Sequence, residues 1–362
     1  MVPMLTDSFG NASSIHHFGQ VAKQKLEGAR RQVAALLGCQ AAEIFWTSGG
    51  TESNNLAILG AIRASGFQAK HAVTTAIEHP AVLSPMERVD AAVTVVGVGR
   101  SGVVDPNEIR RAMRPGETVL VSVMHANNEI GTIQPIAEIA VIAHEAGALL
   151  HVDGVQAAGK IPGVDVRCAD LYTISGHKLQ APKGIGVLYV RKGVKLDPLL
   201  FGGHQERDRR PGTENVAGAV ALGRAAQWFV ENGVAEAARL GALRDRLEQG
   251  VRQKVGFASL NCAGSSRVAN TANIRFDGIE GEPMVIALDL KGFAVSSGAA
   301  CSSGAVEPSH VLTAIGLSKE DARSCVRISL GRCNDERQVD SLIEAVAQAA
   351  HHLYRISPAY AG

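Results

Sequence analysis

A lysine stands directly after a predicted buried strand, where a cationic side chain is unusual. Residues 170–174 have the apolar pattern of a strand, and Ser175, Gly176, His177 and Lys178 follow it. An ammonium group held in an apolar setting gives up its proton more readily, which a lysine needs in order to form a Schiff base. The alternative is a surface lysine on a loop, which is the more common outcome for a lysine considered alone.

Two other segments favour the functional interpretation. Residues 48–53, Ser-Gly-Gly-Thr-Glu-Ser, lie between a predicted strand and a predicted helix, so free N–H groups and the Thr51 hydroxyl could hold a phosphate. The same small polar residues would also suit an ordinary helix cap. Asp153 ends another predicted strand, Gln156 follows it, and the ring nitrogen of a pyridine-type cofactor requires a carboxylate. Lysine, aspartate and phosphate cradle together predict a pyridoxal phosphate site.

A second glycine-rich segment, residues 97–102, matches the dinucleotide fingerprint Gly-x-Gly-x-x-Gly but lacks its context. The fingerprint should open a helix directly, whereas here residues 103–105 intervene before Pro106, a natural first residue of a helix. We therefore predict a turn at these glycines and no dinucleotide site.

Alternating strands and helices must position these residues. This alternation predicts a mostly parallel sheet covered on both faces. The strand-like segments are residues 43–47, 71–76, 118–124 and 149–153, and the helical ones are residues 53–64, 80–89 and 136–146. Residues 170–174 and 185–190 could then pair without a helix between them.

A long alanine-rich helical segment, residues 215–255, leads into a second domain, with a break predicted near Asn232-Gly233. The elements expected beyond it are a strand at 272–276, a helix at 283–290, a loop at 296–305, a helix at 309–315, a strand at 325–330 and a helix at 336–354. We thus predict an α/β fold with a large cofactor domain, residues 1–233, and a smaller α+β domain, residues 234–362.

The composition excludes several classes of function. Of the 362 residues, 36 are Lys or Arg and 35 are Asp or Glu, so stable nucleic-acid binding is not expected. No apolar run approaches the ~20 residues that cross a membrane, and residues 1–10 do not resemble a secretory signal, so we expect a cytoplasmic protein. The six cysteines include no C-x-x-C pair, and we predict no metal site.

Seven segments resemble, in the right order, motifs of the NifS/IscS type of cysteine desulfurase, a fold-type-I pyridoxal phosphate enzyme of the class-V aminotransferase family. The match runs from about Ser8 to about Glu336, and seven ordered motifs are far more specific than any one of them. The segments are residues 10–16, 51–55, 78–79, 127–131, 175–178, 210–213 and 297–301.

The resemblance implies a role for each matching residue around the cofactor ring. Lys178 would hold the cofactor covalently, and Asp153 would keep its ring nitrogen protonated. Gln156 would hydrogen-bond the phenolic oxygen of the ring. His79 would stack on the ring and move protons, and its alternative is a core histidine.

The resemblance also implies ligands for the phosphate and for the substrate. Asn128 and Arg327 would hold the substrate carboxylate, Arg327 through a bidentate pair. Thr213 matches the residue that reaches the phosphate of the partner subunit, so a homodimer is expected. The other phosphate ligands would be Gly50, Thr51, Ser175 and His177.

Cys301 would carry the distinctive step. Small residues flank it on both sides, at 296–300 and 302–305, so this loop can bury little apolar surface and is expected to move. Its thiolate would attack the sulfur of the substrate and carry the resulting persulfide to an acceptor. The alternative is an inert small residue in a loop.

Two features set the chain apart within the family. Relatives usually begin with a strand and a Leu-Asp-x-x-Ala-Thr-Thr-like segment before the position of Ser8, and from its absence we expect lower stability before any loss of chemistry. The loop reads Cys301-Ser302-Ser303-Gly304, which resembles the longer-loop NifS/IscS type more than the SufS subgroup.

The resulting hypothesis is conversion of L-cysteine to L-alanine with the sulfur left on Cys301. The sulfur would pass to an acceptor protein, such as an iron–sulfur scaffold, or serve thiolation. The alternatives are a selenocysteine lyase or another aminotransferase-like enzyme, which Cys301 argues against, and a catalytically impaired sulfur-relay paralogue.

Overall fold

The computed structural model describes residues 1–66, 70–297 and 308–357. These residues form two compact units. The larger unit contains residues 1–96, 104–126 and 134–233, and the smaller one contains residues 97–103, 127–133 and the chain from residue 234 onward. Two short segments therefore belong to the smaller unit although the sequence places them early. The division into domains after residue 233 stays a prediction.

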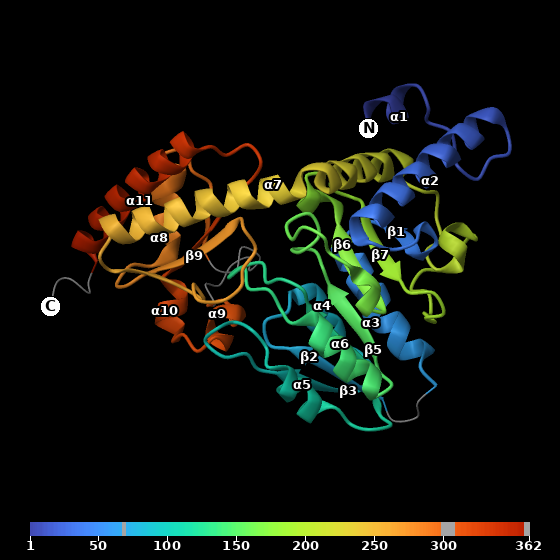
Figure 1. Ribbon diagram of the computed structural model, residues 1–362, viewed down its shortest axis with the longest axis horizontal. Helices are drawn as coiled ribbons and strands as arrows, with labels where there is room; N and C mark the ends of the chain where they lie inside the picture. The colour runs from blue at the N-terminus through green and yellow to red at the C-terminus, as the bar shows by residue number, and fades with distance from the viewer. Residues whose placement is uncertain (67–69, 298–307, 358–362) are drawn as a thin grey trace. The chain divides into compact units, whose positions relative to one another are not determined.

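A seven-stranded sheet is the centre of the larger unit (Figure 1). Its order is β1-β7-β6-β5-β4-β2-β3, with β7 antiparallel to both β1 and β6 and all other neighbours parallel. This confirms the predicted α/β fold with a mostly parallel sheet. The strands are β1 (Ile44–Thr47), β2 (His71–Thr75), β3 (Ala92–Val96), β4 (Thr118–Met124), β5 (Leu149–Asp153), β6 (Leu171–Ser175) and β7 (Gly186–Val190).

Burial on both faces explains the apolar character of these strands. Every residue of β2, β4 and β6 is buried, as strands with parallel neighbours and helices on both faces require, and so is every residue of the antiparallel β7. Helix α3 packs across β4 to β7 and contributes Leu56, Ile58 and Ile62 to the core. The helices are α1 (Val2–Thr6), α2 (His17–Leu37), α3 (Gly50–Ala64), α4 (Pro80–Met86), α5 (Pro106–Ala112) and α6 (Ile136–Glu145), with short 3₁₀ turns η1 (Ala41–Glu43), η2 (Val166–Cys168), η3 (Gly176–Leu179) and η4 (Gln205–Asp208).

The strand ends converge at one glycine of β7. Gly186 lies opposite Thr47 at the end of β1 and opposite Ser175 at the end of β6. A Cβ at Gly186 would stand 2.6 Å from the Cα of Gly49, so only glycine permits this approach. The loop after β1 is thereby brought beside the end of β6.

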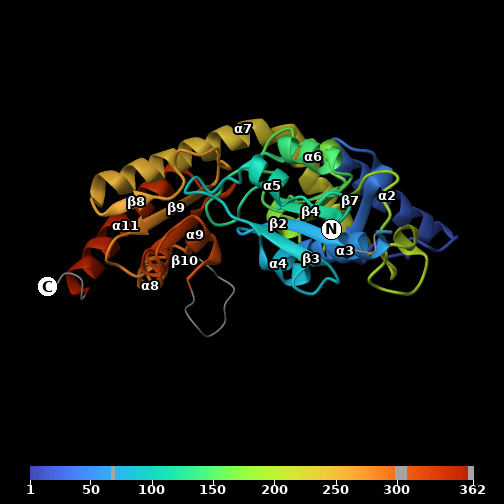
Figure 2. The ribbon, with the colours of Figure 1, turned by 90° about the horizontal axis from the view of Figure 1, so that it is seen from below.

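A four-stranded antiparallel sheet, ordered β10-β11-β9-β8, forms the smaller unit. Its core combines Leu247 of α7, Ile274 and Phe276 of β9, and Val346 of α11. Figure 2 shows α8 beside β10. The elements are α7 (Val216–Lys254), which begins in the larger unit, β8 (Ala258–Leu260), β9 (Thr271–Phe276), α8 (Gly281–Asp289), β10 (Ser296–Ser297), α9 (His310–Ala314), α10 (Lys319–Arg323), β11 (Cys325–Ser329) and α11 (Glu336–Ile356).

The predicted break near Asn232-Gly233 is wrong, because α7 is one helix of 39 residues. A glycine inside a helix costs only about 1 kcal/mol relative to alanine. The Asn232 side chain also donates to the carbonyl of Trp228 one turn earlier, at 2.9 Å, which is compatible with a continuous helix. The sequence patterns also missed α1, α2, β8 and α10, and they placed the short strand β10 in a loop.

The turn predicted at residues 97–102 is confirmed. Gly102 has a φ of +67°, and a Cβ there would stand 2.5 Å from Cδ1 of Ile130. The next helix begins only at Pro106, where the side chain of Asp105 accepts from the N–H of Asn107 at 2.9 Å. Within the described ranges no helix has both the length and the apolar content to cross a bilayer.

Candidate active site

Asp153 is a buried carboxylate at the end of β5. One of its oxygens accepts from the N–H of Val155 at 3.0 Å, and the other accepts from Nδ2 of Asn54 at 2.8 Å. Burial raises the pKa of the Asp153 carboxyl, and the two hydrogen bonds and the nearby His79 oppose that rise. The site is therefore suited to place a negative charge against a cationic ring nitrogen.

The first turn of α3 forms a backbone cradle. Its N-cap is Gly49, which has no side chain to occupy the exposed N–H groups of this 15-residue helix. A Cβ on Gly50 would come within 3.0 Å of Val155 Cγ2 and 3.4 Å of Ser175 Cβ. The Ser175 hydroxyl lies 3.0 Å from Nδ1 of His177. Free N–H groups at a helix start, with hydroxyl and imidazole groups beside them, are suited to bind an anion such as phosphate.

Cradle and carboxylate together fit pyridoxal phosphate. The cofactor has a phosphate at one end and a ring nitrogen at the other, and the larger unit provides complementary groups for both. Val155 connects the two, because its N–H binds Asp153 while its side chain closes against Gly50.

Lys178 lies in η3, directly after β6, with an exposed side chain. The expectation of an apolar setting for the Lys178 ammonium group is therefore wrong for the single chain. The physical reason is that η3 turns the backbone away from the buried strand β6 before Lys178. Gln156 is half-buried, and its Oε1 accepts from Nζ of Lys160. Their proposed roles at the cofactor remain predictions.

His79 is the N-cap of α4, and its Nδ1 accepts from the N–H of Ala81 at 3.0 Å. A neutral His79 in this hydrogen bond carries its proton on Nε2. The preceding Glu78 is fully buried, and its Oε1 accepts from Thr75 Oγ1 at 2.5 Å and from the N–H of Met124 at 2.9 Å. Burial raises the pKa of Glu78 to about 8. Glu78 thus connects the turn that precedes His79 to the end of β4.

An ion pair ties the cradle to the segment that contains Thr213. Nε of Arg210 lies 2.8 Å from Oε1 of Glu52, and Oε2 of Glu52 accepts from the N–H of Ser48 at 2.9 Å. Burial alone would raise the pKa of Glu52, but the hydrogen bonds from Arg210 and Ser48 lower it. Thr213 itself is exposed, and Gly212 before it has a φ of +104°.

In the smaller unit the structure brings Asn128 and Arg327 together. Nη1 of Arg327 donates to the main-chain oxygen of Asn128 at 3.0 Å, and Nη2 donates to Ser296 Oγ at 3.1 Å. Nε of Arg327 is buried and has no hydrogen-bond partner among the residues that the structure describes. A guanidinium group whose plane is fixed and whose Nε–H is free of other partners can donate hydrogen bonds to a carboxylate.

Cys301 belongs to residues 298–307, which lie outside the described ranges, so its predicted role is not placed by the structure. The strand β10 ends immediately before this segment, at Ser297.

A family model described as aminotransferase class-V matches residues 1–342. The chain belongs to the class-V aminotransferase family. The cysteine desulfurase IscS of Dictyoglomus turgidum is 43% identical over 362 residues, which cover 99% of this chain and 92% of that protein.

Solved structures are similar to this chain over nearly its whole length. A NifS-like protein superposes with a TM-score of 0.90 and 35% identity, covering 97% of this chain and 94% of that one. A structure of SspA in complex with cysteine has a TM-score of 0.80 and 34% identity, covering 91% and 92%. The resemblance inferred from the seven motifs and the fold-type-I architecture are thereby confirmed. As a class-V aminotransferase the chain is an enzyme that depends on pyridoxal phosphate.

Asn54 is a further candidate site residue, to which the sequence motifs assigned no role. It lies within the motif at residues 51–55 and is one of the buried residues of α3. Its amide contacts the carboxylate of Asp153, 99 residues away in the sequence. The sequence feature that could have identified Asn54 is a polar residue at a buried position of the helix that follows the phosphate cradle.

Replacement of Asn54 by alanine is expected to move the acid limb of the pH–activity profile upward by about one pH unit. The Asn54 amide stabilises the ionised form of Asp153, and a hydrogen bond to a charged group contributes about 1.5–3 kcal/mol, where one pH unit is about 1.4 kcal/mol. Without this bond the pKa of Asp153 rises further, so the carboxylate is lost at a higher pH on acidification.

The matched control is Asn55→Ala, which removes a side-chain bond to the carbonyl of Thr51 on the exposed side of the same helix. Profiles of kcat/KM against pH for the three proteins check the expectation. An unshifted acid limb in the Asn54 variant would contradict the role of Asn54.

Proposed function

We propose that this chain is a cysteine desulfurase that converts L-cysteine to L-alanine and leaves the sulfur on Cys301 as a persulfide. The similarity to a cysteine desulfurase over 99% of the chain carries the choice of reaction. The buried Asp153, the cradle of α3 and the guanidinium of Arg327 support it, since they complement a ring nitrogen, a phosphate and a substrate carboxylate. A relative solved in complex with cysteine supports L-cysteine as the substrate.

The residues of the larger unit would bind the cofactor and move protons. When bound, pyridoxal phosphate supplies an electron sink for charge that develops on the substrate α-carbon. Asp153, fixed by Asn54 and Val155, would hold the ring nitrogen protonated. Gly50, Thr51, Ser175 and His177 would bind the phosphate. Lys178 would hold the cofactor covalently and, with His79, accept and return protons at the substrate.

Cys301 would supply the sulfur-transfer step. Its thiolate attacks the sulfur of the substrate, a sulfur–sulfur bond forms, and the carbon–sulfur bond breaks. The electron pair of the broken bond remains on the substrate carbon, which takes up a proton to become the methyl group of alanine. No external oxidant is required, because the persulfide sulfur comes from cysteine itself.

Assay of the two products tests this function. The purified holoenzyme should release alanine from L-cysteine, in amounts equal to the sulfur recovered as sulfide after reduction. Strong preference for L-selenocysteine under the same conditions would favour a selenocysteine lyase. Absence of bound cofactor and of alanine would favour a sulfur-relay paralogue.

The proposal extends to an acceptor protein and a homodimer. A relative named IscS supports an iron–sulfur scaffold as the acceptor, with thiolation as the other route. The cytoplasmic location expected from the sequence stays part of this proposal. Thr213 is exposed in the single chain, and we propose that it reaches the cofactor phosphate of the partner subunit.

Mixing two inactive variants is expected to restore activity. A Lys178→Ala subunit and a Thr213→Ala subunit would form heterodimers in which one site has the intact Lys178 of its own chain and the intact Thr213 of its partner. Turnover should then exceed that of either variant alone. Dilution of the native enzyme should also remove activity and cofactor together.

Two results would contradict a phosphate site shared between subunits. If Thr213 served its own subunit, every mixed dimer would carry a defect in both sites and mixing would add nothing. A monomer by light scattering that kept its cofactor and full turnover would contradict the shared phosphate site.

A further inference from the structure

Two consecutive main-chain carbonyls of the smaller unit are held by two side chains from neighbouring strands. Arg327 of β11 donates to the oxygen of Asn128, at 3.0 Å, and Asn273 of β9 donates to the oxygen of Glu129, at 3.2 Å. Arg327 and Asn273 lie directly opposite each other in the β11–β9 register. Paired residues of an antiparallel sheet face the same side, so both side chains reach the same stretch of backbone.

The other ends of the same peptide groups are also held. The side-chain oxygen of Asn127 accepts from the N–H of Glu129 at 2.8 Å and from the N–H of Ile130 at 3.0 Å. Each of the two peptide planes after Asn128 and Glu129 is therefore fixed at its N–H and at its carbonyl. The oxygen that Arg327 contacts cannot rotate without breaking one of these bonds.

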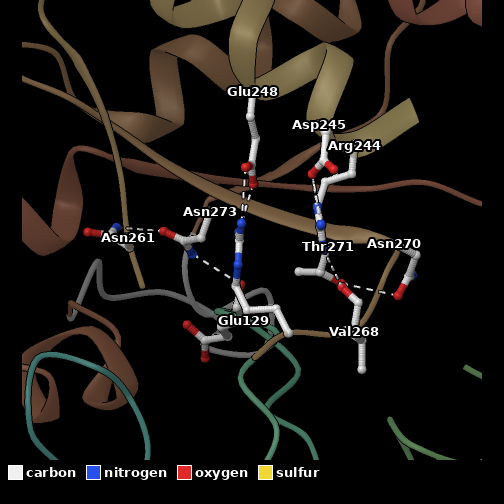
Figure 3. A network of polar contacts seen from close by, with 10 residues as sticks. Glu129, Arg244, Asp245, Glu248, Asn261, Val268, Asn270, Thr271 and Asn273 are labelled. Atoms are coloured by element: carbon white, nitrogen blue, oxygen red, sulfur yellow. Dashed lines mark hydrogen bonds and ion pairs between the residues drawn. The ribbon is translucent and has the colours of Figure 1, made fainter. Parts of the chain in front are cut away.

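Asn273 is itself oriented by a second amide. It is fully buried, and its Oδ1 accepts from Nδ2 of Asn261 at 2.7 Å (Figure 3). Its Nδ2 is therefore directed to the carbonyl of Glu129, as Figure 3 shows. The carboxylate of Glu129 accepts from the hydroxyl of Ser309 at 2.6 Å, and both residues are buried.

We propose that Asn273 is a positioning residue for substrate binding, acting through the backbone at Asn128 and Glu129 on the guanidinium of Arg327. This inference rests on the proposed function, in which Arg327 binds the carboxylate of L-cysteine. A guanidinium recognises a carboxylate through parallel N–H donors in one plane, so its affinity depends on the orientation of that plane. The Asn128 oxygen sets this orientation at Nη1, and Asn273 holds the peptide that follows it.

Asn273→Ala is expected to raise the KM for L-cysteine about tenfold while kcat changes less than about twofold, as for loss of a group that orients a ligand-binding residue. Cysteamine, which has the thiol and the amine of cysteine but no carboxylate, should react with native and variant holoenzyme at similar rates. A merely structural defect would lower both reactions.

Asn270→Ala is the matched control. The side-chain amide of Asn270, like that of Asn273, donates to a main-chain carbonyl of the smaller unit, that of Leu330, at 3.2 Å. Figure 3 shows Asn270 beside Thr271 of β9. It makes no bond to residues 127–130. The KM of this variant should equal that of the native enzyme, and an increase as large as that of Asn273→Ala would contradict the inference.

Arg327→Lys separates this inference from the proposed function. If Arg327→Lys raises the KM for cysteine and Asn273→Ala does not, Arg327 binds the carboxylate and the positioning role is wrong. If Arg327→Lys leaves the KM unchanged, the assigned substrate contact itself is wrong. Should Asn273→Ala fail to fold, Asn261→Ala removes the amide that orients Asn273, together with its weaker contact to Sγ of Cys325. A smaller rise in KM is then expected, and an unchanged KM would overturn the inference.

Discussion

Lys178→Ala is expected to reduce turnover about a thousandfold or more and to abolish retention of the cofactor through gel filtration, because both the covalent attachment and a proton-transfer group are removed. The two losses should appear together, since one side chain serves both purposes. Steady-state rates and the visible absorbance of the purified protein measure them.

Borohydride reduction of the native holoenzyme followed by peptide mapping identifies the attached lysine. We expect the label on Lys178. The control is Lys183→Ala, another exposed lysine of the same loop, which should keep its cofactor and its turnover. A label on Lys183 or Lys160 would contradict the assignment.

Cys301→Ser is expected to bind the cofactor and L-cysteine normally and yet form alanine at about one hundredth of the native rate or less, because the attacking thiolate is missing while the binding residues remain. Rapid-mixing spectra report binding, and product analysis reports alanine. Cys333→Ser is the control, because Cys333 is the exposed cysteine among the described ranges and no role in the reaction is assigned to it. Release of sulfide by Cys301→Ser at the native rate would show that no persulfide on this residue is needed.

Much of the fold could be predicted from local patterns. The strands β4 and β5 have the predicted bounds, because a buried strand in a parallel sheet is a mostly apolar run between turn residues. Helix α2 was missed although Leu26, Val33 and Leu37 recur at helical spacing along its buried face, because it precedes the first strand and stands outside the alternation of strands and helices. The break in α7 was predicted from Asn232-Gly233, and the pattern could not show the backbone bond that Asn232 makes within the helix.

The residue types of the candidate site could be recognised in the sequence, but the contacts between these residues could not. Asp153 and the cradle at Gly50 were recognisable because each lies where a predicted strand ends. The contact of Asn54 with Asp153 spans 99 residues, and that of Arg327 with Asn128 spans 199 residues. No local pattern encodes such pairs, since they arise from strand order and register. The exposure of Lys178 likewise follows from the 3₁₀ turn after β6.

The central claim is that the sulfur of L-cysteine passes to Cys301. A single-turnover reaction of the holoenzyme with L-cysteine, followed by peptide mapping under non-reducing conditions, tests it most directly. We predict one additional sulfur atom on the peptide containing Cys301, in an amount equal to the alanine formed, and none on the peptides containing Cys39 or Cys333. Alanine formed while the Cys301 peptide keeps its unmodified mass would contradict the account.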